Sequence, residues 1–339
     1  MKRAFVSPTV VKSPESYAPS RRFGDIRPYV LIARPDHWFK NAFMVLGVIL
    51  AGFYHPESVG ASTLAPILLA LVGICLIASS NYVLNEILDA PTDLHHPVKR
   101  SRPIPAGQVK LPIAYLEWLV LGAIGTAILY SCNGPVLFAG LALWGMGLIY
   151  NVPPVRSKDL PYLDVLTESV NNPLRLLVGW FAVSQIDVPS VSLLISYWML
   201  GAFLMATKRF AEYRSIADSP SAGRYRRSFK HYDENKLLST MFFYTASTMI
   251  FLGFFIMRYH IELLLSTPLI AGFFAYYIRV GVRPDSPVQN PERLYRERGL
   301  MLYLALCLVT FFGLMFVEIP ALYELFNIRP SGISPLWRL

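Results

Sequence analysis

Residues 81–107, NYVLNEILDAPTDLHHPVKRSRPIPAG, decide how this chain folds. They follow directly on an apolar run at 64–80 that is long enough to enter a membrane. Amides and carboxylates recur at every fourth position, at Asn81, Asn85, Asp89 and Asp93. In a helix this spacing places the four side chains along one face. The sequence therefore predicts a polar helix face at the mouth of a membrane span.

The chemistry of this face is indicated by the basic residues that follow it. Lys99 and Arg102 come shortly after Asp93. Carboxylates beside a basic cluster suit a divalent cation that bridges to a phosphorylated substrate, whose other oxygens the Lys and Arg side chains bind. Pro91 lacks a backbone N–H, so we expect it to end the helix and to place Asp93 in a loop.

Composition sets the class of protein. Hydrophobic residues make up 54% of the 339 residues, charged residues 16%, and the mean hydropathy is +0.43. This is too apolar for an ordinary soluble domain and indicates a polytopic all-α membrane protein. The net charge of +9 is therefore not taken as a nucleic-acid signal, and no nucleic-acid partner is expected. The three cysteines are scattered singly and predict neither disulfides nor a metal site.

Nine apolar segments of roughly 20 residues predict nine transmembrane helices around a central cavity open to the cytoplasm. They lie near 38–54, 64–86, 112–131, 134–150, 160–184, 189–207, 237–257, 260–278 and 299–319. With the N-terminus inside, the N-terminal segment and the loops on the same side together carry all but four of the 31 Lys and Arg residues; the exceptions are Arg175, Arg258, Arg329 and Arg338. The positive-inside rule then makes that side cytoplasmic.

The expected organisation is one transmembrane domain with two tails. Residues 1–28 are basic and rich in Ser and Pro, and no signal peptide is visible, so they predict a flexible cytoplasmic tail. Residues 29–325 form the transmembrane domain and 326–339 a short C-terminal tail. We expect a bacterial inner-membrane protein with a cytoplasmic active site. The oligomeric state stays open.

A second polar constellation starts at Tyr150 and Lys158. In 160–180, LPYLDVLTESVNNPLRLLVGW, the polar residues Asp164, Glu168 and Asn172 again step by four, and Arg175 follows. Ionisable groups inside a span cost roughly 2.5–3.5 kcal/mol each on insertion scales, so this face is expected to line a watery cavity. The alternative is a purely structural polar network between helices. Pro173 is expected to kink the span.

A third group lies at the end of the span at 189–207. Lys208 and Glu212 are placed to close over a phosphate from the cytoplasmic end of that helix. The following basic run at 224–236, RYRRSFKHYDENK, is explained by membrane topology or by contact with anionic lipid headgroups.

Three motifs resemble a known family. They are RPDHWFKN at 34–41, HPVKRSRPI at 96–104 and KRFAEYR at 208–214, together with the acidic face at 85–93. The chain resembles the UbiA-type intramembrane prenyltransferase superfamily, and within it the polyprenyl-phosphate (decaprenyl-phosphate) phosphoribosyltransferases. This resemblance implies a Mg²⁺-dependent membrane transferase. It would move 5-phosphoribose from phosphoribosyl pyrophosphate to a polyprenyl phosphate and release pyrophosphate, as in cell-wall biosynthesis.

The resemblance also implies roles for individual residues. The metal and diphosphate would be engaged by Asn85, Asp89 and Asp93, with Glu86 in place of the usual Asp. Phosphate oxygens would be bound by Lys99, Arg102, Lys158 and Lys208, and the second motif would contain Tyr150 and Asp164. Asp164 or Glu168 would act near the ribose, and Lys40 or Arg175 on the lipid phosphate. The remaining predicted substrate-site residues are Asn172 and Glu212.

Two other functions stay open. The acidic stretch at 164–168 is also typical of relatives that transfer a prenyl group from a prenyl diphosphate to an aromatic or cyclic acceptor. The basic pocket would also suit an anionic-lipid transporter. A transporter, however, gains nothing from stacked carboxylates without a metal.

Overall fold

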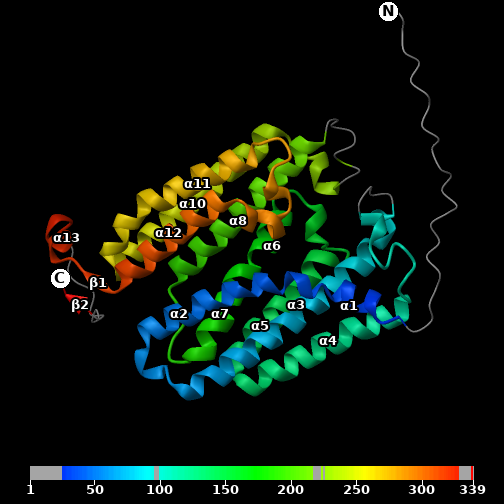
Figure 1. The fold of residues 1–339 in the computed structure, drawn as a ribbon, viewed down its shortest axis with the longest axis horizontal. Coiled ribbons are helices and arrows are strands. Elements are labelled where there is room, and N and C mark those ends of the chain that lie inside the picture. Colours follow the sequence, from blue (N-terminus) through cyan, green and yellow to red (C-terminus); the bar gives the residue numbers. More distant parts are fainter. Residues whose placement is uncertain (1–24, 95–98, 217–222, 224–225, 328–336, 339) are drawn as a thin grey trace, which may run out of the picture.

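The computed structural model describes residues 25–94, 99–216, 223, 226–327 and 337–338, and these form a bundle of long helices (Figure 1). The first half contains α1 (Arg27–Ala33), α2 (Phe43–Tyr54), α3 (Leu64–Asp93), α4 (Leu111–Cys132), α5 (Gly134–Asn151), α6 (Leu163–Ser169) and α7 (Asn171–Val183). The second contains α8 (Val191–Ser215), α10 (Glu234–Tyr259), α11 (Thr267–Gly281), α12 (Arg298–Met315) and α13 (Pro320–Leu325). Two short parallel strands, β1 (Val317–Glu318) and β2 (Trp337–Arg338), pair Val317 with Trp337.

Seven helical segments in the described residues are long and apolar enough to cross a membrane. They are Ala61–Asp93, Leu111–Cys132, Gly134–Asn151, Val191–Ser215, Glu234–Tyr259, Ile261–Gly281 and Arg298–Met315. These confirm seven of the expected spans by length and composition. The other two expected spans are interrupted helices, so the total of nine stays a prediction.

Both interruptions lie in polar sequence. The segment expected at 38–54 begins as the 3₁₀ turn η2 (Pro35–Ala42) and continues as α2. The segment expected at 160–184 is divided into α6 and α7, which meet at Val170. Pro173 lies in the first turn of α7, where its missing N–H removes no helical hydrogen bond. Instead of the expected kink beside Asn172, the helix is interrupted at Val170, two residues earlier.

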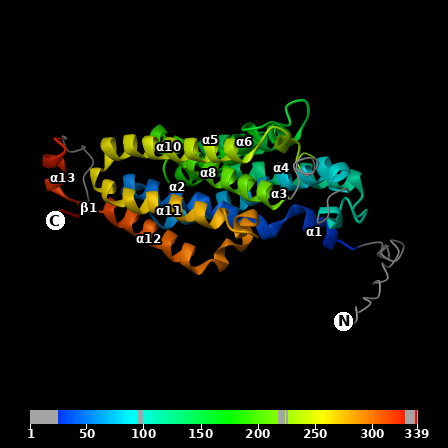
Figure 2. The same cartoon turned by 90° about the horizontal axis from the view of Figure 1, so that it is seen from above.

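The helices form two groups that meet along α7 and α8. In one group α3 packs along α4, α2 along α7, and α5 against both α3 and α7; in the other, α8 packs along α10 and near α11 (Figures 1 and 2). The first group is centred on Met44, Ile74 and Leu143, and the second on Phe203 and Met241. Polar side chains that are buried between the groups therefore come from both halves of the sequence.

The crossing of α2 and α7 depends on two glycines. A Cβ atom on Gly47 would collide with the carbonyl oxygen of Leu176, and one on Gly179 with the carbonyl oxygen of Met44. The two helices therefore approach until backbone meets backbone, as small residues allow in membrane helix pairs. This contact fixes α7, which carries Arg175, against the segment that carries the RPDHWFKN motif.

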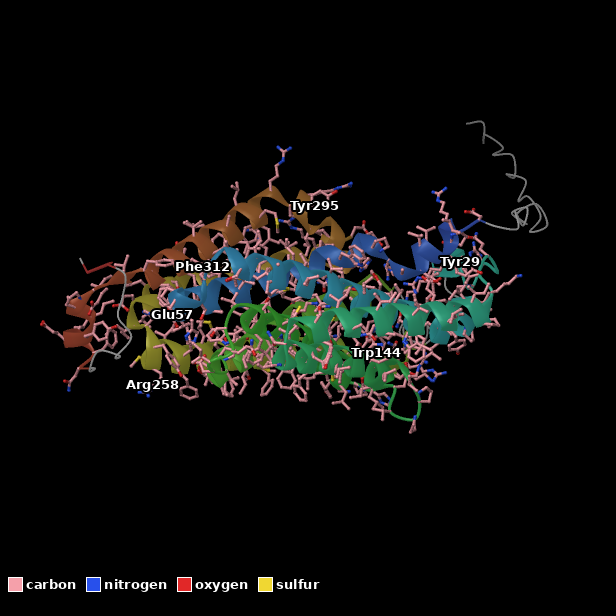
Figure 3. All side chains as sticks on the ribbon, turned by 90° about the horizontal axis from the view of Figure 1, so that it is seen from below. Tyr29, Glu57, Trp144, Arg258, Tyr295 and Phe312 are labelled. Atoms are coloured by element: carbon pink, nitrogen blue, oxygen red, sulfur yellow. The ribbon has the colours of Figure 1, made fainter. Side chains whose placement is uncertain are left out.

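The outside of the bundle is apolar. Phe138 and Phe242 are each 76% exposed and Val309 is 71% exposed. An exposed surface of this kind suits lipid rather than water. The side-chain view in Figure 3 places Glu57 and Arg258 at one end of the bundle and Tyr29 at the other. The site lies toward the Tyr29 end, where α3 terminates.

Candidate active site

The polar face of α3 is directed at α5. Asn81 Nδ2 donates to the carbonyl oxygen of Leu143 (3.0 Å), and Asn85 Nδ2 donates to Asn151 Oδ1 (2.6 Å) at the end of α5. Asn81 and Asn85 therefore lie on the side of α3 that faces α5. The next two positions of this face, Asp89 and Asp93, lie beyond the end of α5 and meet cations instead.

Asp89 is held by two cations from the turn after α5. Its Oδ1 atom accepts from Arg156 Nη2 at 2.8 Å and lies 2.6 Å from Lys158 Nζ. Lys158 also donates to Asn151 Oδ1 at 2.7 Å, which joins it to the amide ladder of α3. Burial lowers the pKa of Lys158 to about 8, even though Asp89 favours its charged form. A bound anion would further favour the charged form of Lys158.

Asp93 is the last residue of α3 and is buried. Its Oδ2 accepts from Arg102 Nη1 at 2.7 Å, and its Oδ1 lies 4.0 Å from Lys99 Nζ. The expectation that Pro91 ends the helix is wrong, because α3 continues through Pro91 and keeps Asp93 helical. A proline this close to the C-terminus removes only one backbone donor, and the Leu94 N–H still bonds to the carbonyl oxygen of Ala90 at 3.1 Å.

The loop after α3 returns its basic residues to the acidic face. Glu86, one turn before Asp89, is buried and accepts a hydrogen bond from the backbone N–H of Ile104 (3.1 Å). This contact anchors the loop that carries Lys99 and Arg102. Burial is also the main reason why the pKa of Lys99 is lowered, and the charges of Arg226 and Arg102 lower it further, against the opposite effect of Asp93. The predicted role of Glu86 toward a metal stays a prediction.

The acidic face suits Mg²⁺ in the kind of its donors. Asn85, Asp89 and Asp93 supply hard oxygen atoms along one helix face, and both cation contacts of Asp89 fall on the same oxygen, Oδ1. Among the described residues, no group of three or more His, Cys, Asp or Glu side chains is arranged to hold a metal ion. Mg²⁺ is commonly bound through one or two carboxylates together with substrate phosphates. The residues therefore fit a metal that arrives with a phosphorylated substrate.

The two acidic residues of the second polar group, Asp164 and Glu168, lie in different surroundings. Asp164 on α6 is fully buried and accepts from Arg209 Nε (3.2 Å), Ser228 Oγ (3.1 Å) and Tyr232 Oη (2.8 Å). Protein donors thus enclose it. Glu168, one turn later, is half-buried and acts electrostatically on Tyr150, Tyr82 and Arg209. Of the two acids predicted near the ribose, Glu168 is the one that is not enclosed in this way.

Two further predicted residues brace α7. Arg175 Nε donates to Asn41 Oδ1 at 2.8 Å, and Asn41 Nδ2 lies 3.2 Å from Cys75 Sγ. Asn172 packs against α8 at Gly201, because a Cβ atom added to Gly201 would collide with the side-chain amide of Asn172. The structure therefore places Arg175 in a contact with the RPDHWFKN motif. Its predicted contact with a lipid phosphate stays a prediction.

The RPDHWFKN motif brings its own cations to the site. Lys40 Nζ lies 6.0 Å from the ring centre of Tyr82 on α3, and Arg34 Cζ lies 5.6 Å from the same ring. Burial lowers the pKa of His37 to about 3, assisted by four neighbouring cations: Lys40, Arg34, Lys208 and Arg102. His37 is therefore neutral and accepts from Arg34 Nη2 at 2.6 Å. Cations from η2, from the loop after α3 and from α8 thus converge on one region.

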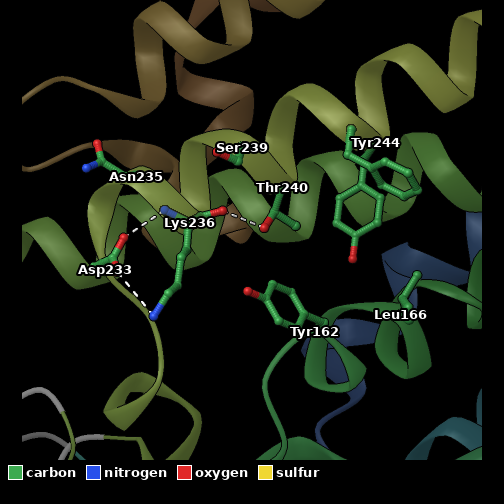
Figure 4. Close-up of a pocket in the computed structure, with 9 residues that line it drawn as sticks. Tyr162, Leu166, Asp233, Asn235, Lys236, Ser239, Thr240 and Tyr244 are labelled. Atoms are coloured by element: carbon green, nitrogen blue, oxygen red, sulfur yellow. Dashed lines mark hydrogen bonds and ion pairs between the residues drawn. The ribbon is translucent and has the colours of Figure 1, made fainter.

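The third motif lies at the end of α8. Arg209 Nη1 donates to Glu212 Oε2 at 3.0 Å, and Lys208 Nζ lies 3.8 Å from Glu212 Oε1. Both predicted residues, Lys208 and Glu212, therefore belong to the same charged cluster as Asp164. An open groove of about 580 Å³ between α6 and α10 runs beside it, with Tyr162, Leu166, Lys236 and Tyr244 among its lining residues (Figure 4).

Several residues of the site were not predicted from the sequence. Arg156 holds Asp89, Arg209 holds Asp164 and Glu212, and Ser228 and Tyr232 complete the shell around Asp164. Burial and the charge of Asp164 raise the pKa of Tyr232, so Tyr232 is a hydrogen-bond donor. Arg156 was detectable from its position next to Lys158. Ser228 and Tyr232 carried no signal, because their partner is far away in sequence.

Comparisons with known proteins identify the family of this chain. The UbiA prenyltransferase family profile matches residues 42–303. Nodulation protein NoeC of Azorhizobium caulinodans is 31% identical over 61% of this chain and 64% of its own length. Protoheme IX farnesyltransferase 2 of Pseudomonas aeruginosa is 28% identical (56% and 64%), and decaprenyl-phosphate phosphoribosyltransferase of Corynebacterium glutamicum is 27% identical (59% and 58%). The chain thus spans under two thirds of the length of these relatives.

The fold is also shared with a solved structure. A UbiA homolog from Archaeoglobus fulgidus, bound to GPP and Mg²⁺, superimposes with a TM-score of 0.64 at 19% identity, over 85% of this chain and 99% of that one. At this identity the likeness concerns the fold alone. The family profile, in contrast, covers most of the chain, including the acidic face of α3 and the cationic turn after α5. The chain therefore belongs to the UbiA prenyltransferase family, as its motifs predict.

Proposed function

We propose that this protein transfers 5-phosphoribose from phosphoribosyl pyrophosphate to a polyprenyl phosphate and releases pyrophosphate. The observation that carries the proposal is that basic residues from several separate segments of the chain lie at one site. The basic residues that contact the site's acids or aromatic rings, or act on their charges, are Arg34, Lys40, Lys99, Arg102, Arg156, Lys158, Lys208, Arg209 and Arg226.

The number of phosphate groups separates this reaction from prenyl transfer. A prenyl diphosphate donor brings one diphosphate group to the site. Phosphoribosyl pyrophosphate brings a diphosphate and a separate 5-phosphate, and its acceptor brings a third phosphate. A region in which cations from η2, the loop after α3, the turn after α5 and α8 converge suits several separate anions. A decaprenyl-phosphate phosphoribosyltransferase is among the relatives, at 27% identity, beside a protoheme IX farnesyltransferase at 28%.

The reaction needs little acid–base chemistry. An oxygen of the lipid phosphate attacks the anomeric carbon of the ribose, the bond from that carbon to the pyrophosphate oxygen breaks, and its electron pair leaves with the pyrophosphate. The acceptor is already an anion, so no strong general base is required. When bound, Mg²⁺ neutralises charge on the departing diphosphate.

The chain's own residues orient and neutralise the reactants. Asp89 and Asp93 would hold the metal, while Arg102 and Lys158 turn from these carboxylates to the diphosphate oxygens. Lys99 and Lys208 supply further positive charge, and Glu168 stabilises the positive charge that develops on the ribose. Lys40 binds the lipid phosphate. The apolar outside of the bundle leaves the isoprenoid tail in the bilayer, with the site on the cytoplasmic side.

Prenyl transfer is the second candidate, because a solved relative of the same fold is bound to GPP and Mg²⁺. The two are separated by supplying purified protein with ribose-labelled phosphoribosyl pyrophosphate plus polyprenyl phosphate, or with labelled farnesyl diphosphate plus an aromatic acceptor. Label in a polyprenyl phosphoribose product supports the proposal, and label in a prenylated product refutes it. A transporter of anionic lipids would release pyrophosphate with neither donor.

A further inference from the structure

The segment 226–233, between α8 and α10, is fixed to the site at several points. Ser228 Oγ and Tyr232 Oη both donate to Asp164, and the buried Phe229 ring packs 5.7 Å from the ring of Tyr213 on α8. At the end of the segment, Asp233 is the N-cap of α10: its Oδ1 accepts from the backbone N–H of Lys236 at 2.8 Å (Figure 4). A cytoplasmic loop that only satisfied the positive-inside rule would not need a buried carboxylate to hold it.

Arg226 begins this segment, and its guanidinium is directed into the site. Its Nη2 donates to Tyr150 Oη at 3.5 Å, and its Nη1 lies 3.7 Å from Asp164 Oδ2. The side chain is 21% exposed. Nη1 is inaccessible to solvent yet has no hydrogen-bond partner among the described residues. A buried donor without an acceptor is unfavourable, so the site gains when an acceptor enters.

The surroundings of Arg226 indicate the charge of that acceptor. Its positive charge acts on Lys99 in the loop after α3 and on Lys208 on α8. The ring of Tyr150 joins Arg226 to a further cation: its hydroxyl accepts from Arg226, and Lys158 Nζ lies 5.9 Å from its ring centre. Like charges repel, so an anion that enters among these side chains lowers the electrostatic energy of the site. A phosphate group matches both the charge and the forked geometry of a guanidinium.

The neighbouring residue, Arg227, differs from Arg226 in exposure and in its acidic partner. Arg227 is 67% exposed and pairs with Asp159 at 3.2 Å on the surface. Exposed pairs of this kind contribute about 0–1 kcal/mol. Arg227 has the same charge as Arg226 and is adjacent to it in the sequence, but its side chain points to the surface. It therefore serves as a matched control.

We propose that Arg226 binds a phosphate group of the donor, and that Asp164 is a positioning residue that clamps the segment carrying Arg226 over the site. The inference rests on the proposed function for the identity of the donor, but not for the presence of a bound phosphate. The proposal accounts for the enclosure of Asp164 by Arg209, Ser228 and Tyr232: through Ser228 and Tyr232, Asp164 holds the segment that carries Arg226.

The test uses full-length protein in detergent with Mg²⁺, and pyrophosphate and ribose 5-phosphate as separate probes in calorimetric titrations. Arg226→Ala is expected to weaken binding of one probe by about tenfold or more, the loss typical of a charge-assisted hydrogen bond. Arg226→Lys should recover part of the loss. Arg227→Ala should bind both probes as wild type does. The probe that is affected identifies the phosphate group that Arg226 binds.

The readings are distinct. Unchanged affinity for both probes in Arg226→Ala overturns the proposal, as does wild-type protein that binds neither probe. Asp164→Asn should weaken the same probe as Arg226→Ala, with little further loss in the double variant; additive losses refute the positioning role. Arg226-dependent binding of pyrophosphate in a protein that never turns over phosphoribosyl pyrophosphate would leave this inference standing and refute only the proposed function.

Discussion

Asp89→Asn is the most informative single substitution in the site. It removes one charge and keeps the size of the side chain. Asp89 Oδ1 receives Arg156 at 2.8 Å and Lys158 at 2.6 Å, and the side chain is only 18% exposed. A charge-assisted hydrogen bond contributes about 1.5–3 kcal/mol and a neutral one about 1 kcal/mol, so weakening both contacts costs roughly 2–3 kcal/mol. This cost is expected in the free energy of unfolding, because both contacts are made without substrate.

Two other consequences of the substitution lower kcat/KM. Asn is a poorer ligand than a carboxylate for Mg²⁺, and Asp89 is the main group that favours the charged form of Lys158. Without Asp89, the pKa of Lys158 falls below its value of about 8, so less of the cation is present at neutral pH. We therefore expect kcat/KM to fall by more than about 100-fold. The measurement is the initial rate of label transfer to polyprenyl phosphate across a range of donor concentrations.

The matched control is Asp159→Asn. Asp159 also accepts from Arg156, at Nε and 3.0 Å, but its other ion-pair partner among the described residues is the exposed Arg227, at 3.2 Å. If Asp89 acted only by restraining Arg156, both variants would lose activity equally. We expect Asp159→Asn to stay within about threefold of wild type. A single cooperative thermal unfolding transition in both variants excludes misfolding. Asp89→Asn with at least a third of the wild-type kcat/KM would refute this account of the acidic face.

Four other outcomes are expected. Since Lys158 has a pKa of about 8 and must be protonated to bind an anion, the donor KM should rise as the pH passes above 8, and Lys158→Arg should remove that rise; a flat wild-type profile contradicts this. Lys99→Ala should raise the donor KM, and unchanged kinetics would leave the basic loop a topological signal only. Gly179→Val should destabilise the α2–α7 contact by roughly 1–3 kcal/mol, seen as a lower unfolding midpoint, whereas Gly145→Ala, which meets no atom within 4 Å, should not. Removal of Mg²⁺ with EDTA should abolish label transfer, and Mg²⁺ should restore it; full activity in EDTA would refute the metal's role.

The local parts of the site follow from the sequence because they depend on short-range geometry. The spacing of Asn81, Asn85 and Asp89 fixes a shared helix face wherever the helix lies. The basic residues after Asp93 return to it because the connecting loop is short. The prediction that Pro91 ends the helix was wrong. A proline removes one backbone hydrogen bond, and the remaining hydrogen bonds of a long helix are enough to continue it to Asp93.

Residues far apart in the sequence could not be paired in advance. Asp164 was predicted beside the ribose, yet Arg209, Ser228 and Tyr232 enclose it. Periodicity reports which face of a helix is polar, but it does not report what the neighbouring helix presents to that face. Arg226 and Arg227 read alike in the sequence, and only their packing distinguishes a buried donor from a surface pair.

The sequence by itself therefore determined the class of protein, the apolar spans, the acidic face of α3 and the family, because each depends on composition or on residues within a few helical turns. The tertiary structure alone decided which cation meets which carboxylate, where α6 and α7 separate, and which arginine enters the site. Those choices depend on how helices from both halves of the chain pack. A buried charge is stable only where a partner of opposite charge or a hydrogen bond reaches it.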